Sequence, residues 1–185
     1  MSAVSEVADR YETVAAGFAR RVANVAPEQW STVTPCPDWT VRDLVAHVIG
    51  TQRAVFARLV ETEPVKVEPE GDLQAQWHEA SRAIAQALGD EARASTIVGG
   101  MFGEQSFESL VGRLVCTDVL VHTWDLSRAT GQDETLDAGA VASSAAFLGS
   151  IDDAIRAPGG FAPKIVPSDD ADPQTVFLNF CGRAI

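Results

Sequence analysis

Apolar side chains recur at intervals of three and four residues along several stretches of the chain, which is the period of an amphipathic helix. The pattern predicts a series of helices over residues 4–25, 40–61, 72–88, 106–131, 137–156 and, briefly, 176–181. Thr40 and Asp43 have the spacing of a capping box, Asp72 is a good N-cap, and Gly131 suits a left-handed C-cap. Only the β-branched stretch 95–98 favours an extended arm.

Prolines and glycines mark the connections between these helices. Pro35 and Pro37 exclude a continuous helix between residues 30 and 39, so we expect an ordered loop there. Residues 62–71 are expected to form a surface connection, and residues 158–160 to end the helix before them. An all-α bundle of four or five helices with irregular connections is the simplest architecture that buries every apolar face. With 185 residues, 46% of them hydrophobic, we expect one domain over 1–185.

Charge and targeting signals narrow the function classes. The 26 acidic and 14 basic side chains leave a net charge of -12, which would repel nucleic acids and anionic membranes. No apolar run approaches the ~20 residues of a membrane helix, and charges interrupt the first 21 residues where a secretory leader would be apolar. We therefore expect a cytoplasmic protein without nucleic-acid or membrane partners. Cys36, Cys116 and Cys181 form no C-x-x-C pair and are expected to be buried thiols.

The three histidines, His47, His78 and His122, limit any histidine-based chemistry to a small set. Asp118 and His122 are four residues apart on one predicted helix, so their side chains share a face. A carboxylate and an imidazole at this spacing can hold one ion such as zinc, nickel or iron, and His47 could supply a third ligand. The spacing alone leaves two other interpretations open, a core histidine at 47 and an ordinary helix-surface pair at 118 and 122. His78 lies in a polar stretch and is expected to be solvated.

Several neighbouring residues have two interpretations each. Asp125 shares the face of the predicted pair and is a candidate to accept a hydrogen bond from a ligand imidazole. Asp43 lies one turn before His47, but its capping-box position favours a role as a cap. Trp39 and Trp124 could line a pocket, although large aromatic residues in a small bundle are more often core.

Three stretches of the sequence resemble a known family. They are TPCPDWTVRDLVAHVIG at 34–50, DVLVHTWDLSRATGQ at 118–132 and FAPKIVPSDDADPQTVFLNFCGR at 161–183. Together they resemble the DinB-like superfamily and, within it, the metal-binding domain of mycothiol-dependent maleylpyruvate isomerase. The resemblance extends over nearly the whole chain. The third stretch resembles the end of small single-domain members of that group.

The resemblance implies a DinB-like four-helix bundle, here with extra short helices, that holds a divalent metal through His47, Asp118 and His122. Zinc is the expected ion, with nickel and iron as alternatives, and mycothiol is the implied co-substrate. The isomerase usually has Glu where this chain has Asp118, which would draw the ion closer to its helix. It also has a second domain that contributes to catalysis, so maleylpyruvate isomerisation itself is not implied.

These observations favour a metal-dependent thiol S-transferase or thiol-assisted isomerase, acting on a small-molecule thiol and an electrophilic substrate. The alternative is a non-catalytic metal-binding or ligand-binding module, and a third interpretation is a structural bundle whose histidines are satisfied internally. Symmetric pairing is the commonest form of oligomer, so a homodimer is expected.

Overall fold

The computed structural model describes residues 5–100, 103–156 and 161–185, and most of them are helical. Contacts divide the chain into two compact units, residues 1–134 and residues 135–185, which are described separately below. Whether they form the single domain expected from the sequence stays a prediction. Among the described residues, no helix has the combination of length and apolar character that a membrane crossing requires.

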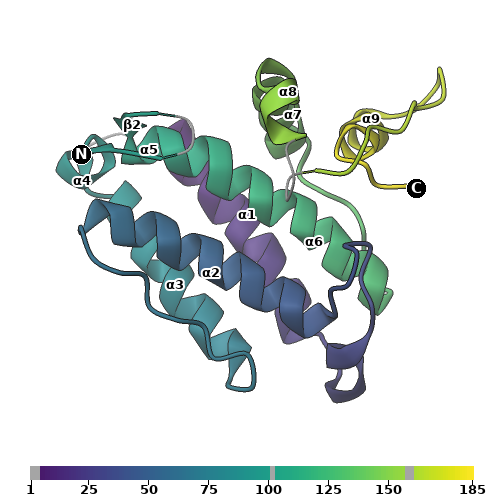
Figure 1. Cartoon of the computed structure of the whole chain (residues 1–185), viewed down its shortest axis with the longest axis horizontal. Helices are drawn as coiled ribbons and strands as arrows, with labels where there is room; N and C mark the ends of the chain where they lie inside the picture. Colours follow the sequence, from purple (N-terminus) through teal and green to yellow (C-terminus); the bar gives the residue numbers. More distant parts are fainter. Residues whose placement is uncertain (1–4, 101–102, 157–160) are drawn as a thin grey trace. The chain divides into compact units, whose positions relative to one another are not determined.

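The first unit is built on four long helices: α1 (Glu6–Ala23), α2 (Val41–Leu59), α3 (Leu73–Leu88) and α6 (Cys116–Thr130). α1 contacts α3 and α6, and α2 contacts the same two helices, so the four close into a bundle (Figure 1). This arrangement confirms the all-α, four-helix-bundle prediction. It also places α2 and α6, which carry the predicted metal ligands, side by side.

The ends of these helices follow local capping chemistry. Ser5 accepts a hydrogen bond from the Ala8 N–H at the start of α1, and the predicted start at Val4 lies outside the described residues. Thr40 and Asp43 form the predicted capping box of α2, and Asp72 caps α3 as predicted. α6 ends at Gly131, whose φ of 69° is the left-handed conformation that favours glycine.

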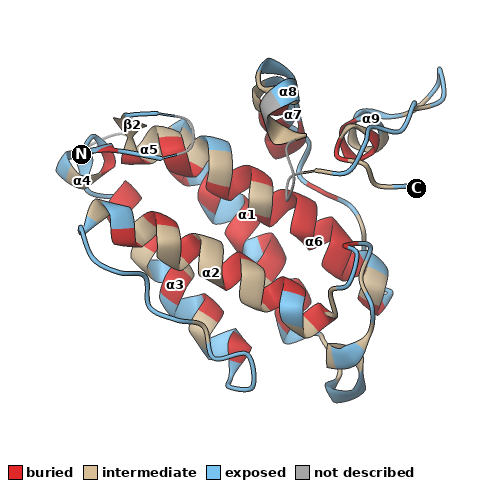
Figure 2. Ribbon diagram, viewed as in Figure 1, coloured by how far each residue is buried: buried red, intermediate tan, exposed pale blue. Residues whose placement is uncertain are grey.

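The bundle core consists of the apolar faces that these helices turn toward one another (Figure 2). Its largest fully buried side chains include Phe18, Ile49, Trp77, Ile84 and Trp124. Each contributes about 1.5–3 kcal/mol through removal of apolar surface from water, so burial decides which helix faces turn inward. The prediction that Trp124 belongs to the core is confirmed.

The chain before α6 departs from the predicted uninterrupted α-helix. The short helix α5 (Phe107–Leu110) leads into a single π-helical turn, η2 (Val111–Val115), in which the Cys116 N–H donates to the Val111 carbonyl five residues earlier. Gly112 lies in this turn, where a Cβ atom would come within 3.0 Å of an Arg10 nitrogen of α1. The first ligand candidate on α6, Asp118, therefore follows directly after a widened helical turn.

The remaining elements of the first unit are short. A 3-10 helix, η1 (Pro27–Ser31), precedes the loop that leads to α2, and α4 (Glu91–Ala94) follows α3. Strand β1 (Ile97–Val98) pairs antiparallel with β2 (Gln105–Ser106), which confirms the extended arm expected near residues 95–98.

The second unit contains α7 (Ala138–Ser150), α8 (Asp152–Ile155) and α9 (Pro173–Phe180), with α7 contacting both of the others. The sequence predicted one helix over 137–156, and this was wrong because Ile151, with φ -129° and ψ 23°, interrupts it. The residues expected to end that helix, 158–160, lie outside the described part.

Ion pairs and hydrogen bonds hold the short helix that follows the break at Ile151. Asp152, directly after it, forms ion pairs with Arg156 and Lys164. Arg156 also donates hydrogen bonds to the carbonyls of Ala162 and Phe180. Arg156 is a local partner, but Ala162, Lys164 and Phe180 come from the later part of the unit, so contacts beyond the preceding helix also orient the turn after Ile151.

Candidate metal centre

The three predicted ligands, His47, Asp118 and His122, come together between α2 and α6. The Oδ1 atom of Asp118 lies 3.2 Å from His47 Nε2 and 3.6 Å from His122 Nε2. One ligand atom from each of the three residues lies within 4.8 Å of the other two. A carboxylate oxygen thus faces two imidazole nitrogens from different helices.

Helix geometry explains this meeting. His47 lies in the middle of α2, whose neighbouring Val45, Val48 and Ile49 are buried and fix the rotation of the helix about its axis. Asp118 and His122 lie one turn apart on α6, so both project from the same side. Because α2 packs against α6, the apolar faces that pair the two helices also align the polar side chains.

Burial increases from one side of the cluster to the other. The exposed fraction of the side chain is 38% for His47, 14% for Asp118 and 10% for His122, and it is 0% for Asp125 behind them. The cluster is therefore open to solvent on the His47 side and closed on the Asp125 side.

Asp125 fixes the state of the His122 ring. Its Oδ2 atom lies 2.9 Å from His122 Nδ1. When Asp125 is ionised its oxygens only accept hydrogen bonds, and in that state Nδ1 carries the proton and donates it. In the neutral ring, Nε2 then presents a lone pair toward Asp118. The imidazole that Asp125 contacts is that of His122, whose role as a metal ligand stays a prediction.

The His47 ring has a different electrostatic environment. Burial lowers the pKa of His47, but the hydrogen bond to Asp118 and the charge of that carboxylate raise it, and the net pKa lies above its ordinary value. In the metal-free protein a proton on His47 is therefore stabilised by the same carboxylate that would share a cation with it.

Two further residues, Trp39 and Cys36, lie beside the cluster. The Trp39 ring centroid lies 4.6 Å from that of His47 and 5.8 Å from that of His122, and this tryptophan is half-buried where the sequence favoured a core position. The Cys36 Sγ atom lies 3.3 Å from Asp125 Oδ2, so Cys36, His122 and Asp125 form a second group of potential donors. Both residues come from the proline-rich loop, which the sequence marked as ordered. Trp39 was a candidate to line a pocket although the core was favoured, and Cys36 was expected only to be a buried thiol.

Other candidates lie away from the cluster or have structural roles. Cys116 is buried, as predicted; burial raises its pKa to about 11, against a smaller lowering effect of the Arg10 guanidinium. Cys181 is likewise a buried thiol, as is Cys36 beside the cluster. His78 is exposed on α3, which confirms that it is solvated.

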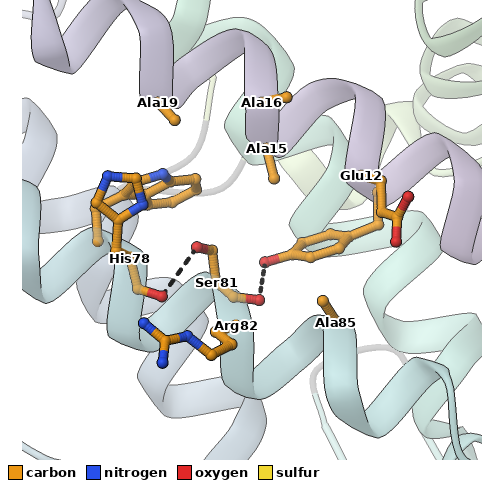
Figure 3. A pocket seen from close by; sticks show the side chains of 10 residues that line it. Glu12, Ala15, Ala16, Ala19, His78, Ser81, Arg82 and Ala85 are labelled. Carbon is orange, nitrogen blue, oxygen red and sulfur yellow. Dashed lines mark hydrogen bonds between the residues drawn. The ribbon is translucent and has the colours of Figure 1, made fainter.

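A shallow hollow of about 350 Å³ lies between α1 and α3. Figure 3 shows small alanine side chains of α1 facing His78, Ser81 and Arg82 of α3. None of the residues that line the hollow belongs to the His47, Asp118 and His122 cluster. The hollow and the candidate metal centre are therefore separate features of the first unit.

Comparisons with known proteins agree with this picture. Residues 11–127 match the family model described as the mycothiol maleylpyruvate isomerase N-terminal domain. Two uncharacterised proteins of Mycobacterium tuberculosis, from strains CDC 1551 and H37Rv, are each 33% identical over 177 residues, covering 91% of this chain and 92% of the relative. No solved structure matches the chain. The family match spans α2, α3 and the candidate ligands, and the chain therefore belongs to the mycothiol maleylpyruvate isomerase N-terminal domain family.

Proposed function

We propose that His47, Asp118 and His122 bind one divalent cation, with zinc as the expected ion, and that the protein is a metal-dependent thiol S-transferase or thiol-assisted isomerase. The observation that carries the proposal is the Asp118 carboxylate. Its Oδ1 atom faces two imidazole nitrogens, and its Oδ2 atom is buried with no hydrogen-bond partner among the described residues.

The hydrogen-bond acceptors that face one another in the cluster favour a bound cation. With Nδ1 of His122 donating to Asp125, the Nε2 lone pair and Asp118 Oδ1 are two acceptors facing each other at 3.6 Å. Two facing acceptors repel unless a proton or a metal ion lies between them. Buried polar atoms in native proteins nearly always have partners, so the remaining Asp118 oxygen also favours a missing positive charge.

The donor set fits zinc. Two imidazole nitrogens and one carboxylate oxygen are common zinc ligands, and three protein ligands leave an open position for water or substrate. A cation bound there would lower the pKa of a coordinated thiol and hold it as a thiolate. The exposed side of His47 is the side from which such a thiol would enter. His47 and His122 would both be engaged as ligands, with the Trp39 ring packed against the two imidazole rings.

The family supports the class of thiol. Its model is named for mycothiol, a small-molecule thiol, which makes a thiol of that type the expected co-substrate. In a transfer reaction the thiolate sulfur would bond to an electrophilic carbon, and the leaving group would depart with the bonding electron pair.

Metal analysis and cobalt substitution test the proposal. The purified chain should bind one equivalent of Co²⁺, and alanine at His47, Asp118 or His122 should each remove most of it, while His78→Ala should bind like the native chain. Adding a small thiol to the cobalt form should produce a sulfur-to-cobalt charge-transfer band. A bound ion that responds to no thiol would favour the non-catalytic module, and full binding by His122→Ala would reject the ligand assignment.

A further inference from the structure

The Cys36 thiol contacts the carboxylate that holds His122. Its Sγ atom lies 3.3 Å from Asp125 Oδ2 and 3.8 Å from His122 Nδ1. The same Oδ2 atom accepts the hydrogen bond from His122 Nδ1 at 2.9 Å. Because the carboxylate only accepts, the thiol is the donor in its contact with Asp125. One oxygen thus receives an S–H from the loop and an N–H from the imidazole.

The loop that carries Cys36 is held by its own hydrogen bonds. The Thr34 hydroxyl accepts from the Cys36 N–H at 3.2 Å and donates to the Trp39 carbonyl at 3.0 Å. The Thr34 N–H also donates to the Trp39 carbonyl, and the Val41 N–H donates to the Thr32 carbonyl. Hydrogen bonds within the loop and to the start of α2 therefore hold the thiol in place independently of its contact with Asp125.

Because both residues are buried, the hydrogen bond from Cys36 matters for the orientation of Asp125. Cys36 is 9% exposed and Asp125 is fully buried, so water is a poor substitute for the thiol donor. A carboxylate in a dry environment depends strongly on each hydrogen bond that it accepts. Losing the S–H donor would leave Asp125 less constrained and, through it, the His122 ring.

We propose that Cys36 is a positioning residue of the candidate metal centre. Its thiol donates to Asp125, and Asp125 in turn holds His122 in the tautomer whose Nε2 lone pair faces Asp118. This inference rests on the proposed metal site, but the state of the His122 ring is defined in the metal-free protein as well. The role calls for a hydrogen-bond donor at position 36, which serine can partly replace and alanine cannot.

The first test is independent of metal. Ring-nitrogen NMR of the metal-free protein at pH 8 reports the tautomer of His122 in the native chain, Cys36→Ser and Cys36→Ala. We expect the Nδ1–H form in the native chain and a largely retained form in Cys36→Ser. In Cys36→Ala we expect a mixture of tautomers, because a carboxylate that has lost the S–H donor can turn away from His122 Nδ1 and no longer fixes the proton there. An unchanged Nδ1–H form in Cys36→Ala would overturn the proposal even if the chain bound no metal.

The second test measures zinc affinity. Loss of a residue that supports a ligand histidine typically costs 10- to 100-fold, and Cys36 acts one contact further out, so Cys36→Ala should bind about 3- to 10-fold more weakly. Cys36→Ser should fall between it and the native chain, and Cys181→Ala, which removes another buried thiol, should bind like the native chain. In an Asp125→Ala background, Cys36→Ala should have little further effect.

The outcomes separate the possible failures. Equal zinc affinity in Cys36→Ala and the native chain would overturn the inference and leave the proposed function standing. Sulfur-to-cobalt charge transfer in the native chain without added thiol, lost in Cys36→Ser, would make Cys36 a ligand and overturn its positioning role. An absence of metal binding in the native chain would overturn the proposed function alone. If Asp125→Ala does not fold, the tautomers of the single variants decide.

Discussion

Replacing Asp118 with asparagine should weaken cation binding sharply and leave the metal-free protein at least as stable as before. The substitution keeps the size of the side chain and removes its charge. It therefore separates the two effects of the carboxylate, attraction of a cation and repulsion of the His122 lone pair that faces Oδ1 at 3.6 Å.

The size of the binding loss follows from what one ligand contributes. Structural zinc sites with four protein ligands bind with about 10–16 kcal/mol, or about 2.5–4 kcal/mol for each ligand. At about 1.4 kcal/mol per factor of ten, Asp118→Asn should lower zinc affinity by roughly two to three decades. Asparagine can still offer its amide oxygen, so the loss should lie toward the lower end of that range.

The metal-free protein should respond in the opposite direction. The new amide N–H can donate to His122 Nε2, and one hydrogen bond contributes about 0.5–1.5 kcal/mol. In a protein of this size, about 1 kcal/mol corresponds to about 2–4 °C in melting temperature. With a chelator present at pH 8, the variant should melt at the native temperature or up to about 6 °C higher.

Competition with a chromophoric chelator measures the affinity, and thermal melts in excess chelator measure the stability. Asp9→Asn is the matched control, because Asp9 is exposed on α1 and its substitution changes the net charge equally. Zinc affinity within threefold of native in Asp118→Asn would show that the carboxylate is no ligand. A melting temperature several degrees lower without metal would show that its main role is a structural ion pair.

Three further predictions concern pH, backbone conformation and thiol reactivity. Zinc affinity should fall as the pH drops, because imidazole ligands must be neutral to bind the ion. Since the pKa of His47 is raised, the fall should start above pH ~6.5. A competition titration from pH 5 to 8 that stays flat would contradict this expectation. Gly131→Ala should lower the free energy of unfolding by about 1 kcal/mol, because Gly131 has φ 69°. Gly149→Ala, within α7, should instead raise the free energy of unfolding by about 0.5–1 kcal/mol. Denaturant melts that show the same sign for both variants would refute the reasoning. Burial raises the pKa of Cys116 to about 11, so its thiol should be alkylated far more slowly in the folded chain at pH 8 than in urea, and mass spectrometry showing equal rates would count against that burial.

Features set by neighbouring residues could be predicted from the sequence. The Thr40 and Asp43 capping box and the Asp72 cap depend on contacts within one turn, so their residue types identify them directly. The meeting of Asp118 with His122 likewise follows from helical spacing. The approach of His47 needed the family resemblance as well, because its partner carboxylate lies 71 residues away in sequence.

What could not be predicted depends on long-range contacts. Cys36 and Asp125 are 89 residues apart, and nothing in the local pattern at either one specifies the other. Trp39 was interpreted as core on general frequency, but the loop places it against two imidazole rings. Gly149 lies just before the break at Ile151, but one glycine does not specify where a helix ends, and Lys164, a partner of Asp152, comes from later in the chain.

The π turn at Val111–Val115 has a consequence for how the chain length could vary during evolution. A π turn closes five residues apart where an α turn closes four, so it accommodates one additional residue within a helix. A relative that lacks one residue here could form an ordinary α turn, and α5 and α6 would still turn the same side chains toward the bundle core. A deletion between Asp118 and His122 would instead turn one ligand by about 100° relative to the other. A one-residue deletion should therefore be tolerated in this turn and excluded a few residues later.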